Sequence, residues 1–281
     1  MRTIPSSFDP ARLAGIDAAL STIETGHRVA IGLAIESGSR AWGFPSPDSD
    51  YDCRFLFVRR AEDYLSPWHR RDVIELPLED ELDINGWDLG KALKLLLKGN
   101  AVVIEWLTSP IVYRGDPALR EEMLALAERF ANRTGIARHY LHLGEKQRRT
   151  YFADGKPVRL KKAFYALRPA AALRWLRRHP EAVVAPMHFP TLMAECEPPR
   201  EVATLVADLI LRKAETRELG EAPLPPAIVT FVDEEFASAR DLLPAKSPRL
   251  DPAAREAAET LFRAAVTRLG PAGSTCGRAD G

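Results

Sequence analysis

The sequence has few cysteines and no long apolar run, and both absences limit the kind of protein it encodes. Its 281 residues include 3 cysteines (Cys53, Cys196 and Cys276) at no metal-ligand or disulfide spacing, so we expect no disulfide scaffold. No stretch of about 18 uncharged apolar residues occurs, so we expect no membrane span. The opening segment, MRTIPSSFDPARLAG, lacks the continuous apolar region of a secretory signal. We therefore expect a cytoplasmic protein.

Net charge is also absent, because 39 Lys and Arg balance 39 Asp and Glu. The balance is uneven along the chain, since residues 133–178 carry 13 basic and 2 acidic side chains. Such a stretch attracts polyanions such as nucleotide phosphates or a nucleic-acid backbone. A solvated helical face would look the same in sequence. The protein as a whole is therefore not a polycation, but its centre is strongly basic.

The hydrophobic pattern predicts an α+β protein with two parts. Residues 1–116 read as a small mixed-sheet domain, with a helix starting at Asp9-Pro10 and ending at Gly26. Its remaining predicted elements are strands at 28–37, 50–60 and 81–89 and a helix at 88–99. Residues 117–269 read as an all-helical domain, with helices predicted at 117–132, 134–152, 158–178, 199–218 and 251–268. Residues 270–281 read as a flexible tail, and nothing assigns a function to residues 190–281.

The residues that carry chemistry lie mainly between positions 38 and 54. Gly38 and Ser39 stand where a strand passes into a helix, which offers free backbone N–H groups to a phosphate. Asp50 and Asp52 alternate at the start of the next strand, so both carboxylates point to one face. Asp83 lies between apolar neighbours on the third strand. Three converging carboxylates predict a site for two divalent cations and in-line phosphoryl transfer.

These motifs resemble the polymerase-β-like nucleotidyltransferase superfamily, with its G-S, a D-x-D about ten residues later, and a further carboxylate on a neighbouring strand. The similarity is closer to a branch of predicted nucleotidyltransferases that includes members found in RNA-repair gene neighbourhoods. It covers roughly residues 28–190. The matching motifs are Gly38-Ser39-Arg40-Ala41-Trp42-Gly43, Ser49-Asp50-Tyr51-Asp52-Cys53-Arg54, Trp87-Asp88-Leu89-Gly90-Lys91, Gly99-Asn100, Glu105-Trp106-Leu107 and Lys161-Lys162-Ala163-Phe164-Tyr165-Ala166-Leu167-Arg168-Pro169.

The resemblance implies an Mg²⁺-dependent (or Mn²⁺-dependent) nucleotidyltransferase. Asp50 and Asp52 would hold two metal ions, and Asp83 would bind the second ion and help to activate an acceptor hydroxyl. Gly38 and Ser39 would grip the β- and γ-phosphates of a nucleoside triphosphate such as ATP. A nucleoside monophosphate would pass to the acceptor and pyrophosphate would leave. An RNA end is the first choice of acceptor, by analogy with the family.

The third carboxylate is ambiguous in sequence, because Asp83 and Asp88 both stand in LDINGWDL. They are five positions apart and point to opposite faces of a regular strand. Asp88 also suits the N-cap of the following helix. Asp83 is therefore the favoured third ligand.

Five basic or aromatic residues are expected to support nucleotide binding. Arg40 and Arg54 flank the acidic motif, where they either clamp a phosphate or pair with the local aspartates. Lys161, Tyr165 and Arg168 follow i, i+4, i+7 spacing, so they share a face of the predicted helix. On that face Tyr165 would stack on a base while the two cations meet phosphates; the alternative is a packed tyrosine with snorkelling neighbours.

Two other functions fit the same motifs. One is a catalytically idle nucleotide-binding or toxin-neutralising module, favoured if the carboxylates are held in salt bridges with Arg40 and Arg54. The other is an adenylyltransferase that modifies a small molecule, favoured by an acidic pocket beside the metal site. A basic groove leading away from the site would favour RNA. The sequence does not determine the oligomeric state.

Overall fold

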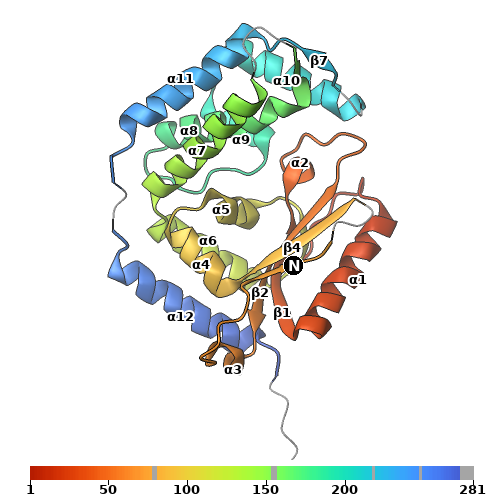
Figure 1. Cartoon of the computed structure of the whole chain (residues 1–281), viewed down its shortest axis with the longest axis vertical. Coiled ribbons are helices and arrows are strands. Elements are labelled where there is room, and N and C mark those ends of the chain that lie inside the picture. Colours follow the sequence, from red (N-terminus) through yellow and green to blue (C-terminus); the bar gives the residue numbers. More distant parts are fainter. Residues whose placement is uncertain (78–80, 153–156, 217–218, 247–248, 273–281) are drawn as a thin grey trace, which may run out of the picture.

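The computed structural model describes residues 1–77, 81–152, 157–216, 219–246 and 249–272, and it confirms the α+β fold. A five-stranded mixed sheet is built by the first 115 residues, and a largely helical region follows (Figure 1). The last nine positions of the predicted tail, 273–281, lie outside the described residues, as does Cys276. Cys53 and Cys196 are buried and free. No helix in the described ranges is long and apolar enough to cross a membrane.

The elements alternate over the first third of the chain and are mostly helical afterwards. The strands are β1 (Val29–Glu36), β2 (Tyr51–Arg59), β3 (Val73–Glu75), β4 (Leu82–Asp88), β5 (Val112–Gly115), β6 (Val158–Arg159) and β7 (Glu221–Ala222). The helices are α1 (Pro10–His27), α2 (Gly38–Ala41), α3 (Ala61–Tyr64), α4 (Leu89–Leu97), α5 (Ala101–Thr108), α6 (Pro117–Phe130), α7 (Arg133–Tyr151), the 3-10 helix η1 (Leu160–Lys162), α8 (Phe164–Arg178), α9 (Phe189–Cys196), α10 (Arg200–Glu215), α11 (Pro226–Leu242) and α12 (Pro252–Leu269).

The sheet has the strand order β3-β4-β2-β1-β5. Strand β1 pairs antiparallel with both β2 and β5, whereas β2 and β4 run parallel in the centre. The parallel register pairs Tyr51 with Leu82 at one end and Phe57 with Asp88 at the other. Because β2 and β4 start at the same end of the sheet, their first residues meet at one edge.

The two faces of the sheet are covered by different helices. On one face, α1 packs against alternate residues of β2, including Cys53, Phe55 and Phe57. On the other, α4, α5, α6 and α12 pack against Leu56, Val58 and their neighbours on β1. Asp52 and Arg54 continue the row of Leu56 and Val58, so they lie on this second face. Figure 1 shows α1 on one side of the strands and α4, α6 and α12 on the other.

A third apolar cluster joins the helical region to the sheet. It is formed mainly by α7 to α11, but it also includes Phe44 from the loop after α2 and Ala101 and Ile104 from α5. Helices α6 and α12 belong instead to the cluster that covers the sheet. The predicted boundary at residues 116 and 117 stays a prediction, although α12 returns across it to pack on β1 and β2.

The structure corrects some predicted elements of the helical region. The helix predicted from residue 158 begins at Phe164, because β6 and η1 precede it. Strand β6 pairs with β7, so this region also contains a short two-stranded sheet. Helices α9 and α11 were not predicted. In α11 the buried Ile228, Phe231, Val232 and Phe236 follow a clear helical period, but the proline-rich segment before them reads as a loop.

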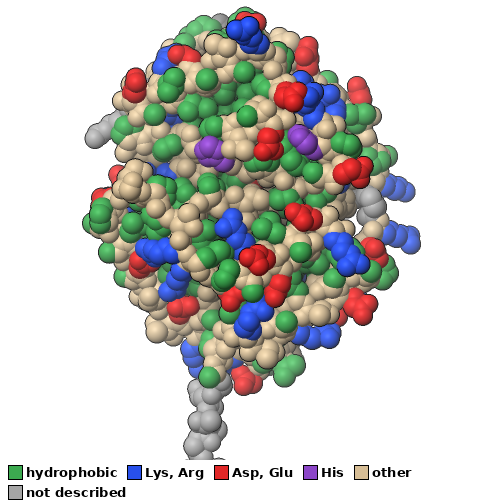
Figure 2. Space-filling view, turned by 180° about the vertical axis from the view of Figure 1, so that it is seen from behind, with side chains coloured by type: hydrophobic (Ala, Val, Ile, Leu, Met, Phe, Trp, Pro, Cys, Tyr) green, Lys and Arg blue, Asp and Glu red, His purple; other side chains and the backbone are tan. Residues whose placement is uncertain are grey.

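The arginines of the basic stretch are largely neutralised by acids that come later in the chain. On α8, Arg174 and Arg177 both bind Glu235 of α11, and Arg178 binds Glu197. Other pairs are Arg148 with Asp233 and Arg159 with Glu221. Much of the positive charge of the stretch is therefore paired within the protein and does not form a free polyanion-binding surface. Figure 2 shows acidic and basic side chains interspersed over one face of the molecule.

Candidate functional site

Two of the three predicted carboxylates are cross-strand neighbours. The parallel register of β2 and β4 sets Asp52 directly beside Asp83, near the start of both strands. Asp50 precedes β2 by one residue and is exposed. Asp88 lies at the other end of β4, where its carboxylate accepts from the N–H of Gly90 at 2.8 Å and caps α4. Of the two aspartates of β4, Asp83 therefore lies beside Asp52, and Asp88 does not.

Arg54 lies between the two neighbouring carboxylates. Its Nη2 atom is 3.1 Å from Asp52 Oδ1 and 2.7 Å from Asp83 Oδ2, and Nη1 donates to the backbone carbonyl of Asp83. Burial, together with the charges of Asp83 and Asp50, raises the pKa of Asp52 above its ordinary value, although Arg54 opposes this rise. The site therefore concentrates negative charge that one guanidinium only partly neutralises.

The carboxylates fit a divalent cation by their chemistry. They supply hard oxygen donors of the kind Mg²⁺ and Mn²⁺ prefer, and the strand register sets Asp52 directly beside Asp83. Within the described ranges, however, no three His, Cys, Asp or Glu side chains stand close enough together to form a metal-binding group. Arg54 is bound to Asp52 and Asp83 in this structure. The three aspartates are therefore near one another, but they are not arranged as the ligands of a metal ion.

Gly38 brings the backbone of the glycine motif against Asp52. Its φ is +63°, a conformation that L side chains rarely adopt. A Cβ atom at this position would lie 2.0 Å from Asp52 Oδ2. Gly38 begins α2, which is a single turn of four residues and so contributes little macrodipole. The turn offers backbone N–H groups and the Ser39 hydroxyl instead.

Ser39 and Arg40 hold the loop that leads from α2 to β2. The hydroxyl of Ser39 donates to Ser49 Oγ at 2.9 Å. Arg40 donates to the backbone carbonyls of Ser49 and Asp50, and its guanidinium lies 3.9 Å from the ring centre of Tyr51. Arg40 thus binds the backbone of the acidic motif and stacks on an aromatic ring, and it makes no ion pair with the aspartates in the part of the chain described here.

The same loop is clamped against the helical region. The Phe44 ring stacks on Phe164 at 4.4 Å, and the N–H of Phe189 donates to the carbonyl of Trp42. Tyr165 of α8 lies edge-on to Trp42, 6.5 Å between ring centres. Burial and Tyr151 raise the pKa of Tyr165, and the charges of Asp52 and Asp50 add to the rise. Tyr165 therefore lies close to the carboxylates, on the side formed by the helical region.

The three residues predicted to share one helix face do not do so. Lys161 lies in η1, ahead of α8, where its charge acts on Tyr165 and on Lys213. Arg168 points into the interior, with a side chain 8% exposed, and binds Glu105 at 2.5 Å. Its guanidinium lies 3.8 Å from the ring centre of Trp42. Lys161 and Tyr165 remain near the carboxylates, whereas Arg168 is occupied by an internal partner.

Two buried residues next to the site were not predicted. Glu36, at the end of β1, accepts from the N–H of Asp52 and the hydroxyl of Tyr113, and burial raises the pKa of Glu36 to about 8. Lys213 of α10 donates to the carbonyl of Phe44 at 2.6 Å, and burial lowers the pKa of Lys213 to about 8. Glu36 could have been singled out in the sequence, because it is a charged residue at the end of an apolar strand. No feature of the sequence around Lys213 indicates that it lies beside the site.

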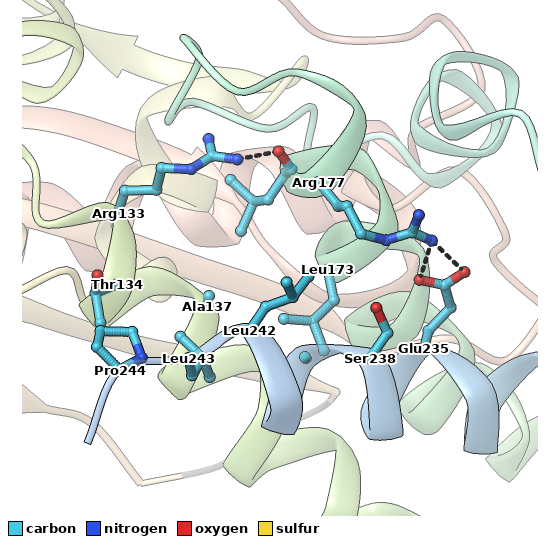
Figure 3. Close-up of a pocket in the computed structure, with 12 residues that line it drawn as sticks. Arg133, Thr134, Ala137, Leu173, Arg177, Glu235, Ser238, Leu242, Leu243 and Pro244 are labelled. Atoms are coloured by element: carbon cyan, nitrogen blue, oxygen red, sulfur yellow. Dashed lines mark hydrogen bonds and ion pairs between the residues drawn. The ribbon is translucent and has the colours of Figure 1, made fainter. Parts of the chain in front are cut away.

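A cavity of about 290 Å³ in the helical region is separate from this site and lies between α7, α8 and α11. Figure 3 shows its two arginines bound within the protein. Arg133 donates to backbone carbonyls at and beyond the end of α8, and Arg177 binds Glu235. These contacts fix α7 and α11 against α8, which is a structural role.

Two comparisons with known proteins gave matches. Residues 14–264 match the family model RlaP, described as the RNA repair pathway DNA polymerase beta family. The chain is also 39% identical over 217 residues to the uncharacterized protein YcgL of Bacillus subtilis (strain 168), which covers 77% of this chain and 82% of that protein. The family match includes the sheet, the carboxylates and the helices that face them.

Proposed function

Because this chain belongs to the RNA repair pathway DNA polymerase beta family, we propose that it transfers a nucleoside monophosphate from a nucleoside triphosphate to an acceptor hydroxyl. The family confirms the resemblance to polymerase-β-like nucleotidyltransferases and implies a nucleotide substrate. We further propose a divalent metal, an acceptor hydroxyl and the residues that bind them.

We assign the metal to the aspartates. Asp52 and Asp83 would hold Mg²⁺ or Mn²⁺ together with Asp50, and the ions would neutralise charge on the attacking and leaving oxygens. Arg54 binds both Asp52 and Asp83 in this structure. A metal ion held by Asp52 and Asp83 would take the place of at least one of these contacts, and the guanidinium of Arg54 would then be available to a phosphate oxygen.

The residues around the carboxylates would hold the nucleotide. The N–H groups of the Gly38 turn and the Ser39 hydroxyl face the β- and γ-phosphates, and Arg40 keeps the acidic loop in position through its two backbone bonds. Tyr165, edge-on to Trp42 and close to Asp52, offers a ring on which the base stacks. Lys161 lies near Tyr165 and supplies positive charge to the phosphates.

One observation carries the proposal: Asp52 and Asp83 are cross-strand neighbours, and the Gly38 turn touches Asp52. The test incubates the protein with each nucleoside triphosphate labelled at the α-phosphate, with Mg²⁺ or Mn²⁺, and with separate pools of RNA, protein and small molecules. We expect label to move to one pool and to be lost in Asp50→Asn/Asp52→Asn. Transfer that persists in this variant would overturn the assignment of the aspartates.

One observation favours a second candidate, a catalytically idle nucleotide-binding module. Arg54 ties up Asp52 and Asp83 in ion pairs, which is what such a module would retain. The same assay separates the two functions. Metal-dependent nucleotide binding without transfer to any pool supports the idle module, and transfer excludes it.

A further inference from the structure

A second and larger cavity lies at the opposite end of the sheet from the carboxylates. It measures about 1130 Å³ and is formed by α3, the loop after it, α4 and α12. Arg59 and Asp88, at the far ends of β2 and β4, line its base. Asp88 and Asp83 are five residues apart on β4, which corresponds to about 16 Å along a strand. We refer to this cavity as the α4–α12 groove.

The α4–α12 groove gathers apolar side chains that the rest of the fold leaves exposed. Among the described residues, six large hydrophobic side chains are exposed, and three of them, Leu65, Trp68 and Leu250, line this groove. Trp68 is 81% exposed and Leu65 is 83% exposed. Deeper in the groove, Tyr64 and Phe262 pack edge to face at 4.9 Å. Exposed apolar groups gathered at one concave place indicate an interaction surface.

The groove is also positively charged. Seven Lys and Arg residues line it against four Asp and Glu residues. Each of these acids is already bound to a cation: Asp63 to Arg70, Asp72 to Lys91, Asp88 to Arg59, and Glu259 to both Arg255 and Arg263. Lys94 and Lys98 are exposed and have no ion-pair partner in the described part of the chain. Positive charge therefore remains for a partner.

The cations and the aromatic ring are arranged in a way that suits a single strand of nucleic acid. Lys91 and Lys94 of α4 and its C-cap residue Lys98 follow i, i+3, i+7 spacing, so they form a row along one side of the helix and its end. Single strands bind where a basic groove follows the phosphates and an aromatic ring stacks on a base. A duplex hides the faces of its bases, so it would leave Trp68 unused. In the basic stretch of α7 and α8, Arg148, Arg174 and Arg177 are paired internally, so less of its charge is available to a partner.

We propose that the α4–α12 groove binds single-stranded RNA, with Lys94 and Lys98 on the phosphates and Trp68 stacked on a base. The inference rests on the proposed function only for the identity of the strand as the acceptor. The groove itself lies away from the carboxylates and binds whether or not transfer takes place. The protein would then bind RNA at a place distant from the RNA end that it modifies.

The test measures binding of a short fluorescein-labelled oligouridylate by fluorescence anisotropy, with Asp50→Asn/Asp52→Asn as the background protein. Trp68→Ala should weaken binding about tenfold, in line with the loss of one stacked base. Lys94→Glu/Lys98→Glu should weaken it by at least as much and lower the slope of log affinity against log salt by about 1.4, since two phosphate contacts are lost. The matched control is Lys146→Glu/Arg200→Glu, which reverses two exposed cations on α7 and α10. This control should stay within about twofold of the background protein.

Four results would overturn the proposal. The background protein fails to bind the oligouridylate, or the control pair loses as much affinity as the groove pair, or Trp68→Ala binds as well as its parent. Polyglutamate that competes as strongly as unlabelled oligouridylate would also overturn it, and would indicate an acidic protein segment as the partner. Because the background protein cannot carry out the proposed transfer, a failure of that reaction leaves this test unaffected.

Discussion

Arg168 and Glu105 form a buried ion pair beneath the indole of Trp42. The Arg168–Glu105 distance is 2.5 Å, and the guanidinium of Arg168 lies 3.8 Å from the Trp42 ring centre. Glu105 also accepts from the hydroxyl of Tyr140. The pair thus joins the loop after α2, α5, α7 and α8, four segments that meet beside the candidate site.

Breaking this pair should cost far more than breaking an exposed one. Glu105→Gln leaves the Arg168 charge buried without a counter-charge, so we expect the free energy of unfolding to fall by about 3 kcal/mol. Arg12→Gln, which removes the exposed Arg12–Glu81 pair, should cost less than about 1 kcal/mol. Urea denaturation measures both. The double variant Glu105→Leu/Arg168→Met should recover much of the lost free energy of unfolding. If its loss instead equals the sum of the losses in Glu105→Leu and Arg168→Met alone, the two residues are not coupled.

Gly38→Ala should damage the site directly. The new Cβ would meet Asp52 Oδ2 and would force a positive φ on alanine, so we expect a loss of about 1–2 kcal/mol and of nucleotidyl transfer. Gly26→Ala is the matched control, because nothing lies within 4 Å of its Cβ position and it stands in α1. The control should be neutral or stabilise the protein by up to about 1 kcal/mol. Equal melting temperatures for the two variants would show that Gly38 does not constrain Asp52.

Arg54→Gln should make the stability of the fold depend on divalent cations. Without Arg54, Asp52 and Asp83 repel each other with no positive charge between them. We expect the variant to melt at a lower temperature than the parent in the absence of Mg²⁺ and to gain more on adding it. Thermal unfolding over an Mg²⁺ titration measures this gain. Asp52→Asn in the Arg54→Gln background should abolish it, and an unchanged response to Mg²⁺ would argue against a metal at these aspartates.

The pH dependence of stability should carry the signature of Glu36. Burial raises the pKa of Glu36 from 4.5 to about 8. The polar groups that act on Glu36 are Tyr113, Asp52 and Arg40. Between these values the folded protein keeps a proton that the unfolded chain releases, so this contribution to stability decreases as the pH rises towards 8. Glu36→Gln removes the titrating group. Urea denaturation across this range should therefore find Glu36→Gln gaining stability relative to the parent as the pH rises, whereas exposed Glu62→Gln should follow the parent. A constant difference between Glu36→Gln and the parent would contradict the shift.

What the sequence predicts well is set by local rules. Apolar neighbours marked Asp83 as a carboxylate on a strand, and capping preference identified Asp88 as the N-cap of the following helix. These rules need only a few neighbouring residues. The family motifs, read together, also located the strand, turn and helix that build the site.

The rest depends on partners far away in the chain. Arg168 looks like a phosphate ligand until Glu105, 63 residues earlier, is seen to bind it. Lys213 looks like an ordinary helix residue, yet it binds the carbonyl of Phe44, 169 residues before it. The basic stretch is similar, since its acids lie on α11 and after α9. An ion pair between residues far apart in the chain cannot be recognised from the spacing of residues near either partner.

The position of α12 has a consequence for how this protein is made. Ala254, Ala258, Leu261 and Ala265 belong to the apolar layer that covers β1, β2 and α4. The sheet that carries the aspartates is therefore synthesised long before the helix that finishes its core. On the ribosome, that layer stays open until the last helix emerges. A chain that stops before residue 252 would expose it permanently, so quality control by chaperones and proteases should discriminate sharply between full-length and truncated products.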